Sequence, residues 1–487
     1  MVSNVNFREE YRRVASGHSK APHHPLNGHT ANGGNMDERS PLLPGLPGTH
    51  EASHRHRHGF WWHVFLNKRA TPGTDSPNPF VRYPAHFWMV VKATLLSTWI
   101  NLLLVFVPLG IIAGKQEWGA PWVFSLNFCA IIPLAAVLSF ATEEIAARLG
   151  EALGGLVNAT FGNAVELIVS IVALNAGEIE VVQASMLGSI LSNLLLVLGM
   201  CFFLGGIYNM RDANGHGSEQ SFAQGTAQTT CSLMALSSAS MIIPAALYGV
   251  LDRSAEDDKK TASILLLSRG TSIILLLLYC MYLYFALHTH KKLFEPETQQ
   301  QQAEQQERLA EDPEEGHAEE EPVLGPWSAG MVLIATTVII SVCADYMVDS
   351  IDALVATGKI SKNFIGLILI PIVGNAAEHV TACVVAVKNK MDLAMGVAIG
   401  SSIQIALLVT PSLVMLGWAI GQPMTLHFET FETIAFALSV MVVTYTVQDG
   451  KSNYLEGAML VGLYLIIAVA FWVSPSEVLD KTGFGLW

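Results

Sequence analysis

Charged residues are scarce in this chain: they make up 14% of its 487 residues, whereas hydrophobic residues make up 51%. A soluble globular protein carries about 25% charged residues, so the deficit argues against that class. Hydrophobic runs of about 18 or more residues recur along the chain, and this is the length that a helix needs to cross a bilayer. The sequence therefore predicts an all-α, polytopic membrane protein.

Several other classes of site are missing. No basic surface interleaved with aromatic residues stands out, so we expect no nucleic-acid partner, although the net charge of −14 alone does not exclude one. The six cysteines show neither a disulfide framework nor zinc-site spacing. We interpret them as small apolar residues: Cys129, Cys201, Cys231, Cys280, Cys343 and Cys383. We expect no cofactor.

The N-terminal region has no early hydrophobic run. The first run begins near residue 85, so no cleavable signal peptide is expected. Residues 1–84 are predicted to be a disordered cytosolic tail. Within it "SHRHRHGFWWH" is either a solvated basic tail or a soft-cation site built from His54, His56 and His58, and "ERSPLL" resembles an acidic dileucine sorting signal.

We count eleven candidate membrane spans. An extra helix is expected within 85–115, five helices within 116–290 and five within 326–475, followed by a short tail at 476–487. The linker at 291–325 includes eleven carboxylates and one arginine, so it is expected to stay in the cytosol and to modulate transport. Lysine and arginine positions favour a cytosolic N-terminus, although Lys259, Lys260, Lys359 and Lys362 fall on the other side.

An internal repeat is the strongest pattern. "GNAVEL" at 162–167 recurs as "GNAAEH" at 374–379, and "GSILSN" at 188–193 is matched by "GSSIQI" at 400–405. The separation from glutamate to glycine is 22 residues in both copies. Because each copy holds five spans, an odd number, the copies enter the membrane from opposite sides. Such inverted repeats place a substrate site near the bilayer midplane and permit alternating access.

Each copy of the motif carries a glutamate within an apolar segment. A charged side chain at the bilayer centre costs about 2.5–3.5 kcal/mol, so Glu166 and Glu378 are candidates for a functional site. Inversion is expected to bring them face to face. Two close carboxylates repel each other unless protons or a cation neutralise them. This competition is the basis of an antiporter.

The neighbouring residues suit a hard cation. Asn163 and Asn375 each precede a glutamate by three residues and share its helical face. Gly162, Gly374 and Pro371 favour an interrupted helix that frees backbone carbonyls, and oxygen atoms of these kinds are calcium ligands. Alternatively, the small residues only permit close helix packing. Further oxygen atoms are expected from Ser189, Ser192, Asn193, Ser401, Ser402 and Gln404.

These segments resemble a known family. "FGNAVELIVSIVAL" and "VGNAAEHVTACVVAVKNKMDLAMGVAIGSSIQIAL" are similar to the core repeats of CAX-type cation/proton exchangers, most of all the fungal vacuolar calcium/proton exchangers. The resemblance implies calcium export from the cytosol into an acidic organelle, driven by returning protons. Manganese is a further candidate substrate, because oxygen ligands suit it too. It also implies that Glu166 and Glu378 are the metal and proton sites. Their supports are then Asn163, Asn375, Ser189, Ser401 and Gln404.

Other acidic and basic residues have two interpretations. Glu143, Glu144 and Glu151 close the second span, and Asp345, Asp349 and Asp352 lie at the matching end of the seventh. They are either a cation-attracting vestibule or solvated helix ends. His379 follows Glu378 without a counterpart in the first copy, and it is either a proton relay or a packing histidine.

The leading hypothesis is a calcium/proton antiporter in a vacuolar membrane, with calcium, protons and lipid as its partners. A sodium- or potassium-coupled calcium exchanger is the nearest alternative. A calcium channel fits less well, because channels encircle a pore with symmetric rings. An enzyme is not expected, since no His-x-x-x-His pattern accompanies the glutamates.

Overall fold

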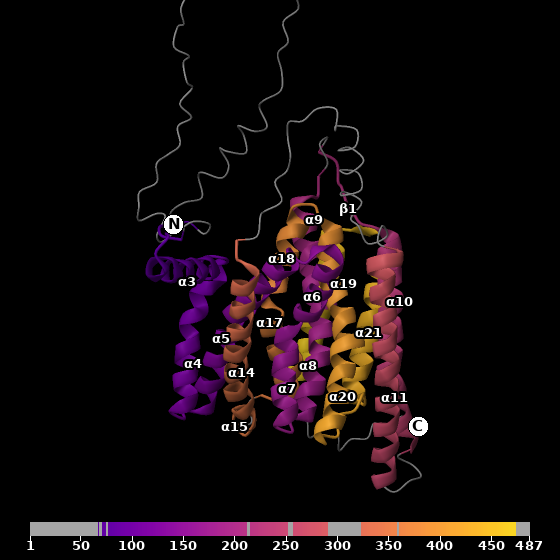
Figure 1. Ribbon diagram of the computed structural model, residues 1–487. Helices are drawn as coiled ribbons and strands as arrows, with labels where there is room; N and C mark the ends of the chain where they lie inside the picture. The colour runs from indigo at the N-terminus through magenta and orange to yellow at the C-terminus, as the bar shows by residue number, and fades with distance from the viewer. Residues whose placement is uncertain are drawn as a thin grey trace, which may run out of the picture. The chain divides into compact units, whose positions relative to one another are not determined.

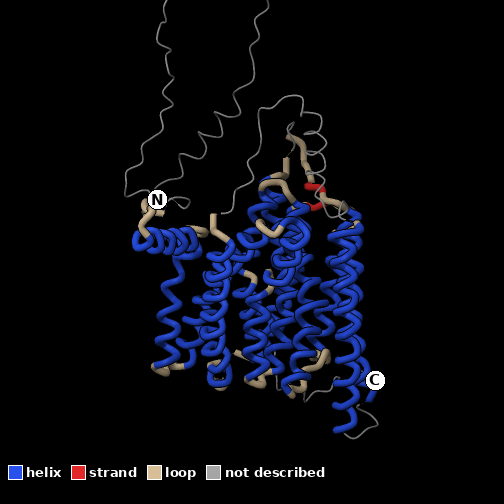
Figure 2. The backbone as a smooth tube through the Cα atoms, in the orientation of Figure 1, coloured by secondary structure: helices blue, strands red, loops and turns tan. Residues whose placement is uncertain are grey.

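The structure is a computed structural model that describes residues 67, 71–74, 76–211, 215–251, 257–290, 323–357 and 360–473. All of them lie within the unit His58–Trp487. They are almost entirely helical (Figure 2). A two-residue antiparallel ladder joins β1 (Gln220–Ser221) to β2 (Lys451–Ser452). Most of the predicted N-terminal tail and acidic linker lies outside the described residues, as do His54, His56, His58 and the side chain of Glu151.

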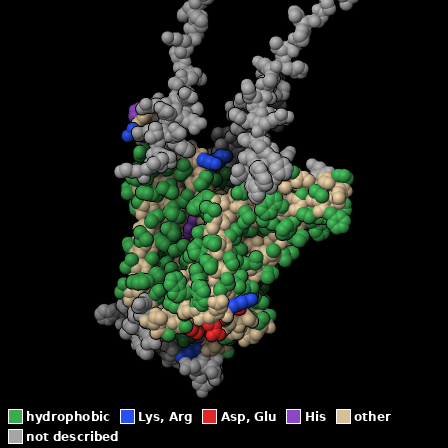
Figure 3. Space-filling model, turned by 90° about the vertical axis from the view of Figure 1, so that its left-hand side faces the viewer, with side chains coloured by type: hydrophobic (Ala, Val, Ile, Leu, Met, Phe, Trp, Pro, Cys, Tyr) green, Lys and Arg blue, Asp and Glu red, His purple; other side chains and the backbone are tan. Residues whose placement is uncertain are grey.

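Membrane-spanning helices dominate the described part of the chain. Seven are long and apolar enough to cross a bilayer, and the number rises to nine if each of two bent pairs is one span. Two shorter apolar helices, Ala164–Asn175 and Thr430–Thr446, accompany them. On one face hydrophobic side chains cover the middle of the molecule, and the visible charged side chains lie toward its ends (Figure 3). The predicted helical membrane fold is confirmed, whereas the count of eleven spans stays a prediction.

The N-terminal span differs from the single helix expected within 85–115. It is divided into α3 (Pro79–Leu95) and a second segment, η1 (Trp99–Val105) with α4 (Phe106–Lys115), bent by 107°. Near the bend the amide of Asn101 donates to the carbonyl of Thr94 at 2.7 Å and to the hydroxyl of Ser97 at 3.0 Å. Such local side-chain bonds compete with the helical ladder, which explains the break.

The predicted repeat is visible in the helix boundaries. The first copy contains α7 (Ala164–Asn175), α8 (Ile179–Leu191) and α9 (Leu198–Tyr208). The second contains α18 (Ala376–Val387), α19 (Met391–Gln404) and α20 (Thr410–Ile420), and each begins 212 residues after its counterpart. Even the π-helical turns that interrupt matching spans correspond: η2 (Ser192–Val197) and η5 (Ile405–Val409).

The two copies run in opposite directions. In Figure 1, α4 descends from α3, so α5 (Ala120–Ala146), which opens the first copy, ascends. The second copy opens with α14 (Pro326–Asp349), which descends to α15 (Ile351–Val355). These two helices pack along each other. The antiparallel contact is the inversion that an odd number of spans requires.

The remaining helices complete each copy. The first adds α6 (Gly150–Phe161), α10 (Gln224–Leu251) and α11 (Asp257–Tyr284) with η3 (Phe285–Thr289). The second adds α16 (Lys362–Phe364), η4 (Ile365–Leu369), α17 (Ile370–Gly374), α21 (Thr430–Thr446) and α22 (Tyr454–Val473). The copies interlock, since α10 packs on α21, α11 on α20 and α22 on α9. The breaks between α6 and α7 and between α17 and α18 therefore lie inside one shared core.

Candidate ion site between the two repeats

Both repeated motifs interrupt a helix, as predicted. In the first copy α6 ends at Phe161 and α7 begins at Ala164. In the second copy the helix pair that meets at Asn375 is bent by 58°. Glu166 and Glu378 each lie in the first turn after the break. A helix N-terminus carries partial positive charge that stabilises a carboxylate, so the break favours acidic residues at these positions.

Each glutamate packs against the motif glycine of the other copy. A Cβ atom added to Gly374 would lie 2.8 Å from Oε1 of Glu166, and one added to Gly162 would lie 3.7 Å from Oε1 of Glu378. The two carboxylates are close enough for their charges to repel. Glu166 is buried, with 4% of its surface exposed. The glycines therefore allow two acidic side chains to approach each other in the centre of the fold.

One part of the site is held together by hydrogen bonds between the copies. The amide of Asn163 donates to Oε1 of Gln404 at 2.7 Å, and the hydroxyl of Ser401 donates to Oδ1 of Asn163 at 2.7 Å. The amide of Asn193 donates to the Ser401 hydroxyl at 3.0 Å. Ser401 also lies beside the carboxylate of Glu378. Gln404 thus accepts a hydrogen bond that ties the first copy to α19.

The site also contains buried polar atoms that make no hydrogen bond to any described residue. Buried polar atoms without partners are uncommon and call for an explanation. Oxygen atoms of carboxylates, amides and hydroxyls are the ligands of a hard cation such as calcium, so this set fits a site for a transported cation. The oxygen atoms are Oε2 of Glu166, Oε2 of Glu378, Oγ of Ser189, Oδ1 of Asn193 and Oδ1 of Asn375.

The charge of this site is limited to two carboxylates. Within the described ranges no group of three or more His, Cys, Asp or Glu side chains is arranged to hold a metal ion. A cation here would therefore be held by Glu166, Glu378 and neutral oxygen atoms. Soft sites for copper or zinc use thiolate or imidazole ligands, and this composition does not match them.

A cavity of about 370 Å³ connects the site with one end of the bundle. Its inner lining includes Gly162, Glu378 and Gln404, and its lining continues along α19 to Asp392 in the first turn of that helix. Twelve residues of α-helix span about 18 Å. Glu378 is thus reached from this end, whereas Glu166 does not line the cavity.

His379 points to a different neighbour from Glu378. Its Nε2 lies 3.3 Å from the hydroxyl of Ser192, and 9% of the residue is exposed. Both His379 and Ser192 were candidate site residues in the sequence, but their contact could not be predicted because they lie in different copies of the repeat. The role of His379 as a proton relay stays a prediction.

The acidic residues expected in a vestibule are not brought together. Both oxygens of Glu144 accept backbone hydrogen bonds just before α14 begins, from Val323 at 3.2 Å and Leu324 at 2.7 Å. Glu143 is its exposed neighbour. Asp345 and Asp349 lie at the other end of α14, and the roughly 20 helical residues between them and the start of α14 span about 30 Å. A single vestibule from these residues is wrong, because inversion places matching helix ends on opposite sides.

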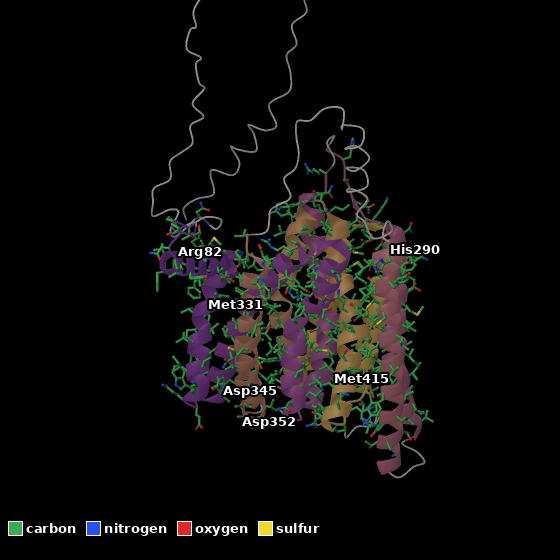
Figure 4. All side chains as sticks on the ribbon, viewed as in Figure 1. Arg82, His290, Met331, Asp345, Asp352 and Met415 are labelled. Carbon is green, nitrogen blue, oxygen red and sulfur yellow. The ribbon has the colours of Figure 1, made fainter. Side chains whose placement is uncertain are left out.

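Figure 4 shows labelled polar side chains at the two ends of the bundle. Arg82 and His290 lie at one end of the bundle, and Asp345 and Asp352 lie at the other. Asp352 forms an ion pair with Lys362 at 2.6 Å, and Glu178 forms a second with the same lysine at 3.0 Å. The acidic residues at this end are therefore partly engaged in holding α16 beside α8.

Sequence comparison places this geometry in a known group. Residues 119–288 and 328–473 match the sodium/calcium exchanger protein family. The chain belongs to this family. The match covers both inverted copies and leaves out the N-terminal region and the linker, so the family assignment rests on the part of the chain that builds the site.

Relatives within the family share most of this chain. It is 48% identical over 387 residues to a vacuolar calcium ion transporter of Schizosaccharomyces pombe, covering 79% of this chain and 87% of the relative. It is 42% identical over 382 residues to vacuolar cation/proton exchanger 5 of Arabidopsis thaliana, covering 78% and 82%. The predicted resemblance to CAX-type exchangers is confirmed.

Solved structures agree with the fold. The Ca²⁺/H⁺ antiporter protein YfkE is 34% identical with a TM-score of 0.61, covering 77% of this chain and 98% of that one. An H⁺/Ca²⁺ exchanger CAX is 12% identical with a TM-score of 0.56, covering 78% and 89%. At that identity the second likeness supports the fold alone.

Proposed function

We propose that this exchanger-family protein is a secondary antiporter that moves cytosolic calcium into an acidic, vacuole-like organelle in exchange for lumenal protons. The observation that carries the proposal is the pair of glutamates, buried Glu166 and half-buried Glu378, that meet across two inverted helix breaks among unpartnered oxygen atoms. The names of the relatives, a calcium ion transporter and a cation/proton exchanger, support the choice of ions.

The exchange follows from competition for two carboxylates. Calcium would be held by Glu166 and Glu378, with neutral oxygen atoms from Asn375 and Ser189. A carboxylate must lose its proton before it ligates a metal, so calcium binding releases protons. Proton binding from the lumen would then expel calcium there. Asn163 and Gln404, which are already hydrogen-bonded to each other, would support the site rather than complete the ligand shell.

The cavity gives the proposed exchanger a direction. Arg82, Arg148, Lys388 and Lys390 lie in or next to elements at the α3 end of the bundle, which favours this end as the cytosolic side. The cavity along α19 opens at the same end, near Asp392. The described conformation would thus accept calcium from the cytosol past Asp392 at the opening, with Glu378 as the first of the two site carboxylates that it meets.

A direct test is uptake of radiolabelled calcium into vesicles that hold the purified protein, with and without an imposed pH gradient. We expect uptake that requires the gradient. Uptake that follows a sodium or potassium gradient and ignores pH would instead support the alternative exchanger. Single-channel currents in a planar bilayer would overturn both. Manganese competition in the same vesicles tests the second substrate.

The paired site has its own test. Replacing Glu166 or Glu378 by glutamine preserves shape and removes the titratable charge, and either change should abolish uptake. Size-exclusion chromatography in detergent checks that the variants remain folded. Substantial proton-driven uptake by a folded variant of either kind would exclude a site shared by both carboxylates.

A further inference from the structure

One face of the site is open along α19. Gly396, Val397 and Gly400 line the cavity, and a Cβ atom added at either glycine would meet nothing within 4 Å. This helix therefore presents small side chains to open space for more than one turn. The opening leads to Ser401, whose hydroxyl holds Asn163.

The equivalent face of the first copy is closed. The residues 212 positions earlier are Ala184, Ser185 and Gly188 in α8, and the first two are only 1% and 3% exposed. A Cβ atom added at Gly188 would collide with the carbonyl oxygen of Leu367 in η4. The same three positions of the repeat are thus open in one copy and packed in the other.

Hydrogen bonding follows the same asymmetry. In the open half, Ser401 donates to Asn163 at 2.7 Å. The counterparts of this pair are Ser189 and Asn375. The Ser189 hydroxyl and both polar side-chain atoms of Asn375 are buried and bond to no described residue. Leaving buried polar groups unpaired is unfavourable, so this half holds polar groups that a different conformation would satisfy.

We propose that these hydrogen bonds change sides during transport. Ser401 holds Asn163 while the α19 face is open, and Ser189 holds Asn375 when the α8 face is open. Inverted repeats reach the opposite state when each copy takes up the conformation of the other. In that state Ser189 would donate to Asn375 as Ser401 donates to Asn163 in the present one. Ser401 and Ser189 are then positioning residues with opposite preferences. This inference rests on the proposed alternating-access exchange.

The test needs a probe for the state that the structure does not show. Ser185→Cys is nearly isosteric, and its position is buried in the present state but equivalent to cavity-lining Val397. A charged thiol reagent should therefore react at position 185 only when the α8 face opens. Val397→Cys reports the α19 face in the same way. The parent chain, with its six native cysteines, supplies the background rate.

The two serines provide a matched pair of variants. Labelling is measured on detergent-purified protein without calcium. Ser189→Ala should lower the labelling rate at position 185, and Ser401→Ala should raise it, each about fivefold for the net worth of one hydrogen bond. The double variant should return near the parent rate. A merely structural effect would move both single variants in the same direction.

The proposal would be overturned if both alanine variants changed the labelling rate at position 185 in the same direction, or if neither changed it. If Ser401→Ala does not fold, Gln404→Met removes the acceptor of the Asn163 amide and should also raise the rate at position 185. Labelling requires no transport. A failed exchange of hydrogen bonds is therefore distinguishable from a failed calcium/proton exchange, which the vesicle assay measures separately.

Discussion

Gly374→Ala is a small substitution whose effect is set by the short clearance between Gly374 and the Glu166 carboxylate. An added Cβ atom would lie 2.8 Å from Oε1 and 3.0 Å from Cδ of Glu166, whereas ordinary Cβ contacts begin at 3.4 Å. The Glu166 carboxylate must therefore retreat by about 0.6 Å or the helix break must widen. Alanine also favours helix over glycine by about 1 kcal/mol, so the fold itself is not expected to fail.

The displacement is large for an ion site. Functional groups need to be held within about 0.5 Å of their productive geometry, and a misplacement of 1 Å costs about 100-fold in activity. For a displacement of about 0.6 Å instead of 1 Å, we expect about a tenfold loss of transport efficiency. Most of it should appear as a higher apparent Km for calcium, because the displaced group is a proposed ligand.

Gly396→Ala is the matched control, since its Cβ would enter open space on α19. Both variants are compared with the parent by initial rates of calcium uptake at several calcium concentrations under a fixed pH gradient. Gly396→Ala should transport like the parent. A folded Gly374→Ala variant with an unchanged apparent Km would refute the contact between Gly374 and the Glu166 carboxylate as a determinant of binding.

Three other outcomes are expected. Glu144→Gln replaces one carboxylate oxygen with an amide NH2 group, which would face the backbone N–H of Val323 or Leu324 as a second donor. Thermal denaturation should therefore show a free energy of unfolding lowered by about 1–3 kcal/mol, while the apparent Km for calcium stays unchanged. Lowering the pH on the calcium-loading side should raise the apparent Km with little loss of maximal rate, because protons occupy the same carboxylates; identical calorimetric binding heats in buffers of different ionisation enthalpy would exclude this competition. His379→Asn should alter the pH profile of uptake more than calcium affinity at high pH, and an unchanged profile would leave His379 a packing residue beside Ser192.

The repeated motifs predicted the centre of the molecule well, because spacing along a helix fixes position in space. Gly162 and Gly374 mark the helix breaks, and Glu166 and Glu378 follow them at the same offset. An odd number of spans then requires inversion. These inferences need only helix geometry and the cost of a charge in lipid, and both can be read from residue type and order.

Two features depended on information that the repeat does not contain. The bend between α3 and η1 lies where the Asn101 amide donates a hydrogen bond to the carbonyl of Thr94. A hydropathy profile does not show such local hydrogen bonds. The second feature is the place of the acidic helix ends, for which the sequence left a vestibule and solvated helix ends as alternatives. In an inverted repeat, equivalent helix ends face opposite sides, so Glu144 and Asp345 are separated by the length of α14.

The asymmetry of the site has a different origin. The Gly-Asn-Ala-x-Glu motif and the following Gly-Ser recur in both copies, so this pattern alone predicts two similar halves. A conformation that opens to one side must break that equivalence, as it does here between Gly400 and Gly188. Which face opens is therefore decided by the packing of α8 against η4 and of α19 beside the cavity, and either arrangement satisfies the same sequence pattern.

The limited charge of the site explains why its two ions would be coupled. Two carboxylates balance one calcium ion or two protons, and the described residues place no third acidic group with them. An empty site would leave two negative charges buried together in the membrane, at about 2.5–3.5 kcal/mol each before their mutual repulsion is added. In the proposed exchanger, the proton-loaded and calcium-loaded forms of the site would be neutral and could change sides, whereas the empty form would carry this electrostatic cost. An exchanger of this kind would suppress uncoupled leak, because the conformational change of the empty site is energetically unfavourable.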